Sequence, residues 1–321
     1  MKFTMKAESK GTMLPSALYG RRYSIGLVAI FVILISIYAL RHSFQETITQ
    51  AHLPFTPFPS KPTPPSNVAA IIEDRPLSNL APLLLHFSSI LGPGWPIVLF
   101  TPEGKEPNSP AFRRAVDDGR ISIRRLPEDL QFGKHQAVSE FLTLPWFWEQ
   151  LAPAGHVLMF QADSIVCTSA NIRVDDFLEY DFVGAPIDVP KDPPNGHGEG
   201  YNGGFSLRNR TMILDIVNKF SWQAEKDAGT ISQAPCVTQE PCLKFEDQWF
   251  YHKMKEIPGA RLPTKEVAST FAVETVWYDT PLGYHQVERW NSDRMDEVAR
   301  WCPEYALATT DLLVKHPVSG G

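Results

Sequence analysis

The stretch His156-Val-Leu-Met-Phe-Gln-Ala-Asp-Ser-Ile-Val-Cys167 is the segment from which the fold can best be predicted. An apolar run of strand length ends just before Asp163, and a second short apolar run follows it. Ligands of open α/β sheets bind at the carboxyl ends of the strands, so a carboxylate there can hold a metal ion and, through it, an anionic ligand. An aspartate that caps the next turn or helix would give the same local pattern. The rest of the sequence must distinguish these two interpretations.

The composition is that of a globular domain with additional segments. The chain has 321 residues, of which 43% are hydrophobic, and a formal net charge of -6 at pH 7. This length suffices for one large core or two modest ones, and nothing in the charge balance indicates nucleic-acid binding. The 4 cysteines are too few for a disulfide scaffold, and no CxxC pair indicates a zinc site.

An uncharged apolar run near the N-terminus predicts a membrane anchor. Residues 25–40, extended by Tyr23 and Ser24, approach the ~18 to 20 residues that a bilayer requires. Basic residues precede this run, whereas Arg41 follows it with Glu46 nearby. This bias predicts a cytosolic tail at residues 1–22, a type II anchor at 23–40 and a lumenal remainder. A cleaved signal peptide is the alternative, but the run begins late and no small-x-small cleavage site follows it.

The segment after the anchor predicts a stem. Many of the 28 prolines lie before residue 66, where they prevent regular hydrogen bonding and favour extended conformations. We therefore expect a Pro-rich stem at residues 41–66, a domain at 67–313 and a tail at 314–321. Such a domain would lie in the secretory lumen, and in the Golgi in particular. That oxidising lumen permits a disulfide between Cys236 and Cys242, which a short loop separates.

Strand-like and helix-like segments alternate through the first part of the domain. Apolar runs predict strands at residues 68–72, 95–101, 121–126, 156–162 and 182–187, and helical spacing predicts helices at 77–91, 111–118, 140–151 and 171–178. This alternation predicts an α/β domain with a Rossmann-like, mixed and mostly parallel sheet flanked by helices. Further on, we expect an irregular loop at 188–200, helices at 211–220 and 246–256, and a strand at 267–276.

Adjacent glycines form a second candidate site. The run Tyr201-Asn-Gly-Gly-Phe-Ser-Leu-Arg208 places Gly203 and Gly204 before a short apolar strand. Glycines in this position either let the backbone approach a ligand closely or make a tight turn.

Two acids and a histidine complete the candidates. Glu246 and Asp247 open a helix, where the helix dipole should keep carboxylates ionised. They are either helix caps or a pair facing a cleft, one of them a general base. His285 follows Pro-Leu-Gly-Tyr in a polar loop, where a histidine can supply a metal ligand.

Taken in order, these features resemble the GT-A nucleotide-sugar glycosyltransferases. They are Asp163, the Asn-Gly-Gly-Phe-Ser-Leu-Arg run, the Glu-Asp-Gln-Trp-Phe helix and the Pro-Leu-Gly-Tyr-His loop. More closely, the chain resembles a fungal domain family of unassigned function grouped with these enzymes, over about residues 68–311. The resemblance implies a GT-A-like fold. It also implies a hexosyltransferase-like transfer from a nucleotide-sugar donor to a hydroxyl of a glycan, glycoprotein or glycolipid acceptor.

The resemblance also implies roles for individual residues. In that superfamily a DxD motif ends the central strand and binds a divalent cation, Mn²⁺ or Mg²⁺, on the donor diphosphate. Here Gln161-Ala-Asp163 keeps only the last acid, so the cation would rely on Asp163 and His285, together with the diphosphate and water. Asp247 is implied as the general base of an inverting reaction, with Glu246 gripping the acceptor. Donor and acceptor contacts are implied at Gln161, Asp163, Tyr201, Asn202, Gly203 and Gly204.

Two other classes stay open at this point. A catalytically inactive domain that binds sugar or nucleotide, or that scaffolds partners, would suit the missing first acid of the DxD motif. A hydrolase with paired carboxylates would need neither a diphosphate site nor a stem.

Overall fold

The computed structural model describes residues 35–39, 67–127, 130, 132, 135–187, 199–230 and 245–309. The chain divides into two units, Met1–Pro62 and Thr63–Gly321. In the first unit, residues 35–39 are helical. Within the described ranges, no helix is both long and apolar enough to cross a membrane. The anchor expected at 23–40 lies mostly outside these ranges, as do the stem and the Cys236–Cys242 pair, so these three stay predictions.

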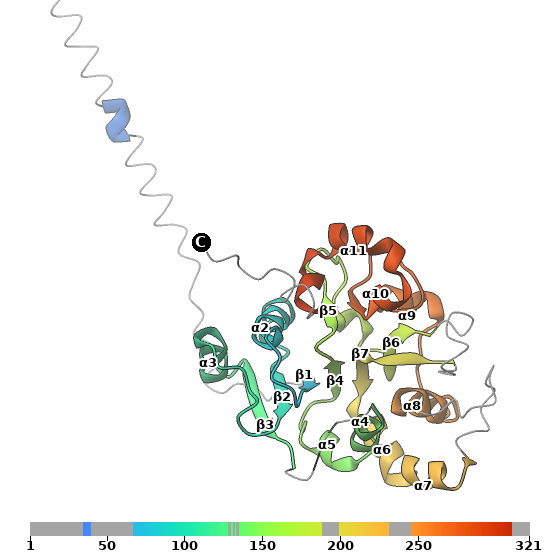
Figure 1. Ribbon diagram of the computed structural model, residues 1–321. Helices are drawn as coiled ribbons and strands as arrows, with labels where there is room; N and C mark the ends of the chain where they lie inside the picture. Colours follow the sequence, from blue (N-terminus) through green and yellow to red (C-terminus); the bar gives the residue numbers. More distant parts are fainter. Residues whose placement is uncertain are drawn as a thin grey trace, which may run out of the picture. The chain divides into compact units, whose positions relative to one another are not determined.

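Six strands of the second unit form one mixed sheet in the order β3-β2-β1-β4-β7-β6 (Figure 1). Strands β3, β2, β1 and β4 are mutually parallel, and β7 runs antiparallel to both β4 and β6. The mixed, mostly parallel sheet expected from the alternating pattern is therefore confirmed. The strands are β1 (Asn67–Ile72), β2 (Ile97–Thr101), β3 (Ile121–Arg125), β4 (His156–Phe160), β6 (Phe182–Pro186) and β7 (Tyr201–Asn209).

A second sheet of three strands, in the order β5-β9-β8, continues from the end of β4. It consists of β5 (Ser164–Val166), β9 (Gly283–His285) and β8 (Ala272–Val273). Strand β9 pairs antiparallel with β5, which places His285 opposite Ser164 and next to Asp163. Residues far apart in sequence are thus brought to the carboxyl end of β4.

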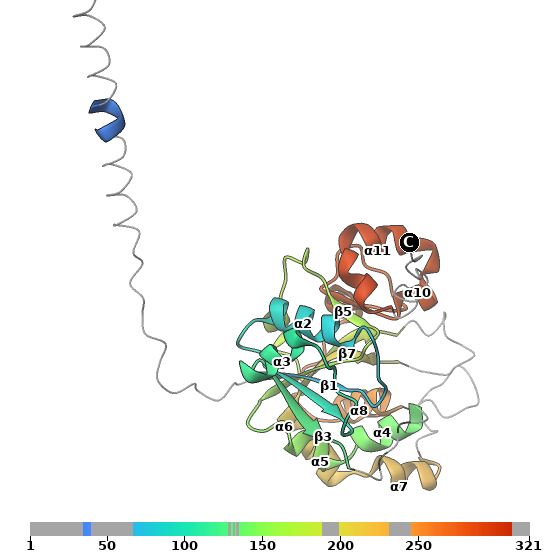
Figure 2. The ribbon, with the colours of Figure 1, turned by 60° about the vertical axis from the view of Figure 1, so that its left-hand side comes forward.

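Helices flank both sheets (Figures 1 and 2). Helices α4 to α8 lie toward the bottom of both views, and α10 and α11 lie toward the top. The α-helices are α2 (Leu80–Leu91), α3 (Pro110–Asp117), α4 (His135–Leu142), α5 (Pro145–Glu149), α6 (Arg210–Lys219), α7 (Trp222–Asp227), α8 (Glu246–Lys255), α9 (Lys265–Phe271), α10 (Val287–Trp290) and α11 (Met295–Trp301). Short 3₁₀ helices are η1 (Val174–Phe177), η4 (Ser292–Arg294) and η5 (Pro303–Leu307).

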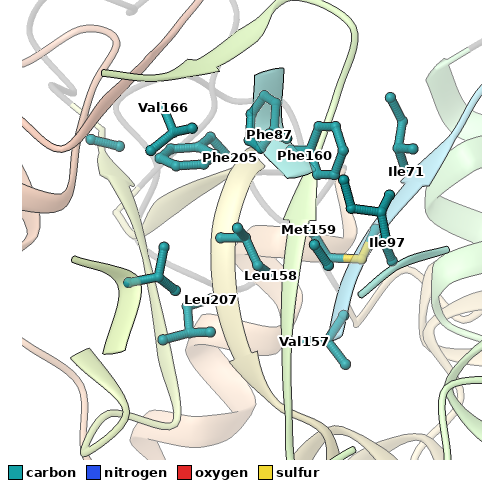
Figure 3. Close-up of a cluster of buried hydrophobic side chains, with 14 of the residues drawn as sticks. Ile71, Phe87, Ile97, Val157, Leu158, Met159, Phe160, Val166, Phe205 and Leu207 are labelled. Atoms are coloured by element: carbon teal, nitrogen blue, oxygen red, sulfur yellow. The ribbon is translucent and has the colours of Figure 1, made fainter. Parts of the chain in front are cut away.

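Strand β4 lies in the middle of the hydrophobic core (Figure 3). Its residues Val157, Leu158, Met159 and Phe160 are all buried, because helices or strands cover both faces of the strand. The ring of Phe87 from α2 stacks on Phe160 with 4.0 Å between centroids. Burial of one such side chain stabilises the fold by about 1.5–3 kcal/mol, so this cluster fixes β4 and the chain that leaves its carboxyl end.

The structure corrects two predicted elements. The helix expected at 140–151 is two helices, because Pro145 has no N–H and begins α5. The strand expected at 267–276 is wrong over most of its length, since α9 occupies Lys265–Phe271 and β8 is only Ala272–Val273. The side chain of Thr264 accepts the N–H of Val267, and this N-cap starts α9.

Two other expectations are changed in detail. The helix expected at 171–178 is the short 3₁₀ helix η1, Val174–Phe177. The adjacent glycines lie within the nine-residue strand β7 rather than in a turn before it. Of the loop expected at 188–200, only residues 199 and 200 are among the described residues.

A disulfide joins Cys167 to Cys302, with 5.1 Å between their Cα atoms. It links the residue after β5 to the residue after α11. Sequence spacing did not indicate this pair, because the two cysteines are 135 positions apart.

Candidate functional site

A cavity of about 470 Å³ opens at the carboxyl ends of β1 and β4. Strands β2 and β3 continue the sheet on one side of this pair, and β7 and β6 continue it on the other. The strand order therefore reverses between β1 and β4, which is where open α/β sheets bind their ligands. Residues 72–75 line the cavity after β1, and residues 159–163 line it at the end of β4.

Asp163 lines this cavity, as a carboxylate at the end of the central strand should. Its side chain is 38% exposed, and its Oδ1 lies 3.4 Å from Nε2 of His285. Its Oδ2 accepts a hydrogen bond of 2.7 Å from the side chain of Gln286. Burial acts to raise the pKa of Asp163, but the charge of the nearby His285 and the hydrogen bond from Gln286 outweigh it and lower the pKa to about 2. Asp163 is therefore ionised at neutral pH.

Gln286 reaches Asp163 through an unusual backbone conformation. Its φ of 44° lies in the left-handed region, which non-glycine residues occupy at a cost of about 1–3 kcal/mol. Its backbone N–H also donates to the carbonyl oxygen of Asp163, at 3.3 Å. Two contacts thus hold a strained residue against the carboxylate.

His285 is buried between two carboxylates. Its Nε2 faces Asp163, and its Nδ1 lies 3.7 Å from Oε1 of Glu274. Burial opposes the charged imidazolium, but Asp163 and Glu274 together raise the pKa of His285 well above its usual value. Gly204 makes room for the ring, because a Cβ atom there would lie 2.2 Å from Nε2.

The two predicted metal ligands, Asp163 and His285, do lie together. Over the ranges that the structure describes, no group of three or more His, Cys, Asp and Glu residues could hold a metal ion. However, Oδ1 of Asp163 is buried and accepts no hydrogen bond within those ranges, and Oε1 of Gln161 lies 3.2 Å from Nε2 of His285. A carboxylate oxygen and an amide oxygen therefore converge beside the imidazole, whose Nε2 must lose its proton before it can bind a cation. They fit a partial set of ligands for a divalent cation, which oxygens of a bound diphosphate and water would complete.

Glu246 and Asp247 begin α8, and both side chains are almost fully buried. Oε2 of Glu246 accepts a hydrogen bond of 2.9 Å from Ser139, and its Oε1 lies 3.3 Å from Nη2 of Arg208. Both carboxylate oxygens of Asp247 accept backbone N–H groups, from Gly203 at 2.8 Å and from Gln248 at 2.8 Å. Of the two acids, only Glu246 lines the cavity. Asp247 does not line it, but it accepts a hydrogen bond from Gly203, which does.

One buried cation faces this pair of carboxylates. Arg208 is fully buried among aromatic rings, with its guanidinium 5.0 Å from the centroid of Phe182. A single positive charge can balance only one of the two acids. Burial and the charge of Glu246 accordingly raise the pKa of Asp247 to about 8, although Arg208 and the two backbone N–H groups act in the opposite direction. Burial and the neighbouring Glu246 thus act against the helix dipole, which was expected to keep both acids ionised.

The glycine strand contributes less to the cavity than expected. Tyr201 is buried, and its hydroxyl donates to the carbonyl oxygen of Pro263. Oδ1 of Asn202 accepts the N–H of Gly204 at 2.7 Å. Gly203 alone of this run lines the cavity, and a Cβ atom there would lie 2.4 Å from Nη2 of Arg208. The glycines thus allow β7 to pack closely against the acid pair and His285.

Sequence reasoning missed several residues of the site. Arg208 lies on β7 and Ser139 on α4, whereas Glu274 follows β8 and Gln286 follows β9, so their pairing depends on tertiary packing. Arg75 and Glu73, which follow β1 and line the cavity, could have been recognised from their place in the sequence. They are charged residues directly after a buried parallel strand.

Comparisons with known proteins give one family and several distant structural similarities. A family model described as "Protein of unknown function (DUF5672)" matches residues 120–285. No curated protein matches the sequence.

Among solved structures, the chain is similar to three transferases. Core-mannan synthase A (CmsA/Ktr4) from Aspergillus fumigatus, in its Mn/GDP form, shares 8% identity at a TM-score of 0.39, over 59% of this chain and 72% of that one. The galactosyltransferase LgtC, in complex with donor and acceptor sugar analogs, shares 14% sequence identity at a TM-score of 0.41, over 73% of this chain and 96% of that one. The glycosyltransferase GlyE of Streptococcus pneumoniae shares 14% sequence identity at a TM-score of 0.44, over 78% of this chain and 62% of that one.

Proposed function

The chain belongs to the family of proteins of unknown function DUF5672, and we propose that it is a glycosyltransferase. It would move a sugar from a nucleotide-diphosphate sugar to an acceptor hydroxyl. The segment matched by the family model contains Asp163, the glycines of β7, the acid pair of α8 and His285. These are the residues that carry the sequence resemblance to GT-A enzymes.

One observation carries the proposal. Asp163 at the end of β4 and Glu246 at the start of α8 line the same cavity, at the point where the strand order reverses. The two residues are 83 positions apart in sequence, since 246 − 163 = 83. A fold that needed these acids only as helix or turn caps would have no reason to bring both to one ligand-sized cavity.

The reaction requires two kinds of group. The acceptor oxygen attacks the anomeric carbon as the bond from that carbon to the diphosphate oxygen breaks, and a base takes the hydroxyl proton. Asp163 and His285, with Gln161 beside them, would hold a divalent cation, Mn²⁺ or Mg²⁺. When bound, such a cation offsets the negative charge that grows on the leaving diphosphate.

We assign the base to Asp247 and acceptor contacts to Glu246, in an inverting reaction. The raised pKa of Asp247, about 8, supports this role because a general base works best when its pKa is close to the working pH. Its hydrogen bond to Gly203 connects it to the cavity. Glu246 lines the cavity directly, which supports its contact with the acceptor.

The test is release of nucleoside diphosphate from a panel of sugar nucleotides, measured with and without manganese. We expect one donor to be turned over, faster with the metal, and faster again when a suitable acceptor is added. Absence of turnover for every donor and acceptor pair, in protein shown to be folded, would exclude the transferase.

An inactive sugar-nucleotide-binding or scaffolding domain is the second candidate. It is favoured by the structural partners that already occupy both oxygens of Asp247 and both oxygens of Glu246. Calorimetry separates the two functions. An inactive domain would bind a sugar nucleotide tightly but leave it intact, whereas the transferase would convert it.

We also propose a type II membrane topology with this domain in the Golgi lumen. The charge bias around residues 23–40 supports it, and so does the Cys167–Cys302 disulfide, because disulfides persist in oxidising compartments. Protease protection in sealed vesicles is the measurement. Digestion of the domain without detergent would contradict the topology.

A further inference from the structure

An ion pair at the rim of the cavity has no part in the chemistry described above. Arg75 and Glu73 follow β1 and line the cavity beside Asp163. Three hydrogen bonds join them, from the backbone N–H of Arg75 at 3.0 Å, from its Nε at 2.8 Å and from its Nη2 at 2.9 Å. The Glu73 side chain is 3% exposed, whereas that of Arg75 is 67% exposed. A buried carboxylate therefore fixes the orientation of an accessible guanidinium.

The bonds to Glu73 leave much of the guanidinium unused. An arginine side chain carries five N–H donors, and Glu73 takes one from Nε and one from Nη2. The remaining donors include both N–H groups of Nη1. They belong to a planar group with the geometry that binds phosphate oxygens in pairs.

The charges around the cavity make this cation distinctive. Among the described residues that line the cavity, Glu73, Asp74, Asp163 and Glu246 are acids and Arg75 is the only base. Its hydrogen bond to Glu73, followed by the charges of Glu73, Asp163 and Asp74, raises the pKa of Arg75 although burial opposes the change. An anionic ligand entering this cavity needs a positive partner, and Arg75 is the side chain in place to provide it.

We propose that Arg75, oriented by Glu73, binds the diphosphate group of a nucleoside diphosphate or its sugar conjugate. The inference rests on the proposed function, because that function brings a diphosphate to this cavity. It adds a protein cation from the end of β1, on the strand that neighbours β4 and Asp163. Glu73 acts as a positioning residue for the guanidinium and does not itself contact the ligand.

The test is equilibrium binding of UDP and of GDP to the folded domain, by calorimetry, with and without manganese. Arg75→Gln should bind the preferred diphosphate about 10- to 100-fold more weakly than the wild type, as loss of charge-assisted hydrogen bonds requires. Binding of the matching nucleoside, which has no phosphate, should not change. The variant removes the charged partner of the buried Glu73, so thermal unfolding must first show that it is folded at the temperature of the binding measurement.

Arg125 supplies a matched control. It also forms a bidentate pair with a glutamate, because its Nη1 and Nη2 donate to Glu106 at 2.8 and 2.7 Å, and its side chain is 45% exposed. This pair lies at the end of β3, and neither residue lines the cavity. Arg125→Gln should therefore leave binding of the diphosphate unchanged.

The outcomes separate the two proposals. Wild-type protein that binds neither diphosphate would overturn the proposed function together with this inference. Wild-type binding that persists undiminished in Arg75→Gln would overturn only the assignment of Arg75. An equal loss in Arg125→Gln, or an equal loss of nucleoside binding, would also overturn it, because the effect would then be general.

Discussion

Asp247 carries a buried carboxyl group that shares one arginine with Glu246. Its pKa is raised from 3.8 to about 8, so the folded protein favours the protonated form. A group of this kind stabilises the fold fully below about pH 4, and that contribution is lost as the pH rises through about 8. This change of stability with pH is opposite in sign to that of an aspartate held ionised by a salt bridge, which stabilises the fold at high pH and not at low pH.

We predict that in Asp247→Asn, whose side chain cannot ionise, the free energy of unfolding changes less with pH than in the wild type. One pKa unit corresponds to about 1.4 kcal/mol. Between about pH 5 and pH 8, the wild type should therefore lose more than about 1.4 kcal/mol of unfolding free energy relative to the variant. Urea unfolding at a series of pH values measures the difference. Parallel curves for the two proteins would show that Asp247 is ionised in the fold at neutral pH.

The same variant tests the catalytic role. Loss of a positioned base typically costs ~10²- to 10⁴-fold in rate and leaves ground-state binding largely intact. Asp247→Asn should therefore lose transfer and still bind the sugar nucleotide. Asp163→Asn should lose both, because it removes an oxygen ligand from the proposed, sparsely liganded cation. A product that keeps the anomeric configuration of the donor would instead demote Asp247 to a structural residue.

Gly204 gives a third prediction at this scale. In Gly204→Ala the new methyl group would lie 2.2 Å from Nε2 of His285, and the buried ring must shift from its position beside Asp163 and Gln161. We expect weaker manganese binding and a lower melting temperature. Gly94→Ala is the control, since no atom lies within 4 Å of the Cβ position there. Unchanged metal binding in Gly204→Ala would show that His285 is not a ligand of the cation.

Among the elements, β7 connects the parts of the site. It pairs with β4, carries Gly203 and Gly204, and ends near the buried Arg208. Arg208 contacts Glu246 on α8 and the hydroxyl of Ser206 on its own strand. Strand and helix therefore depend on one buried charge pair.

We predict that Arg208→Met destabilises the protein by about 3–5 kcal/mol, because it leaves a buried carboxylate without its partner. The double variant Arg208→Met with Glu246→Gln should recover part of this loss. Arg120→Met is the comparison, because its pair with Asp118 is exposed and such pairs contribute at most about 1 kcal/mol. Denaturant unfolding of the wild type, Arg208→Met, Glu246→Gln and the double variant gives the coupling energy. A loss no larger than that of Arg120→Met would contradict the importance of the buried pair.

The elements that sequence predicted well are those with a strong local pattern. Strand β4 is a continuous apolar run and α8 has acids at its start, so both were located correctly. Helix α9 was missed because its apolar residues also suit a strand, and the N-cap at Thr264 is a single-residue signal. The contacts of Arg208 and Arg75 could not be predicted, because no local pattern specifies which buried or strand-end charges meet across elements.

At the scale of the whole molecule, one covalent link joins the sheet to the C-terminal helices. The Cys167–Cys302 bridge spans 135 positions. For a loop of that length, removal of the crosslink in Cys167→Ser with Cys302→Ser should lower the unfolding free energy by about 2–5 kcal/mol. Denaturant unfolding of the variant and of the wild type, both without reductant, measures it. Equal stabilities would show that the bridge does not constrain the unfolded chain.

The same bridge makes a closed ring of the polypeptide. Gly203, Glu246, Asp247 and His285 all lie within this ring, and Asp163 lies just before it. A single cut by a protease anywhere inside the ring cannot release a fragment, because both pieces remain tethered through sulfur. Nicked protein should therefore run as one species on a denaturing gel without reductant and as two after reduction. The nicked protein can in this way keep its acid pair and its strand-end aspartate on one covalent molecule.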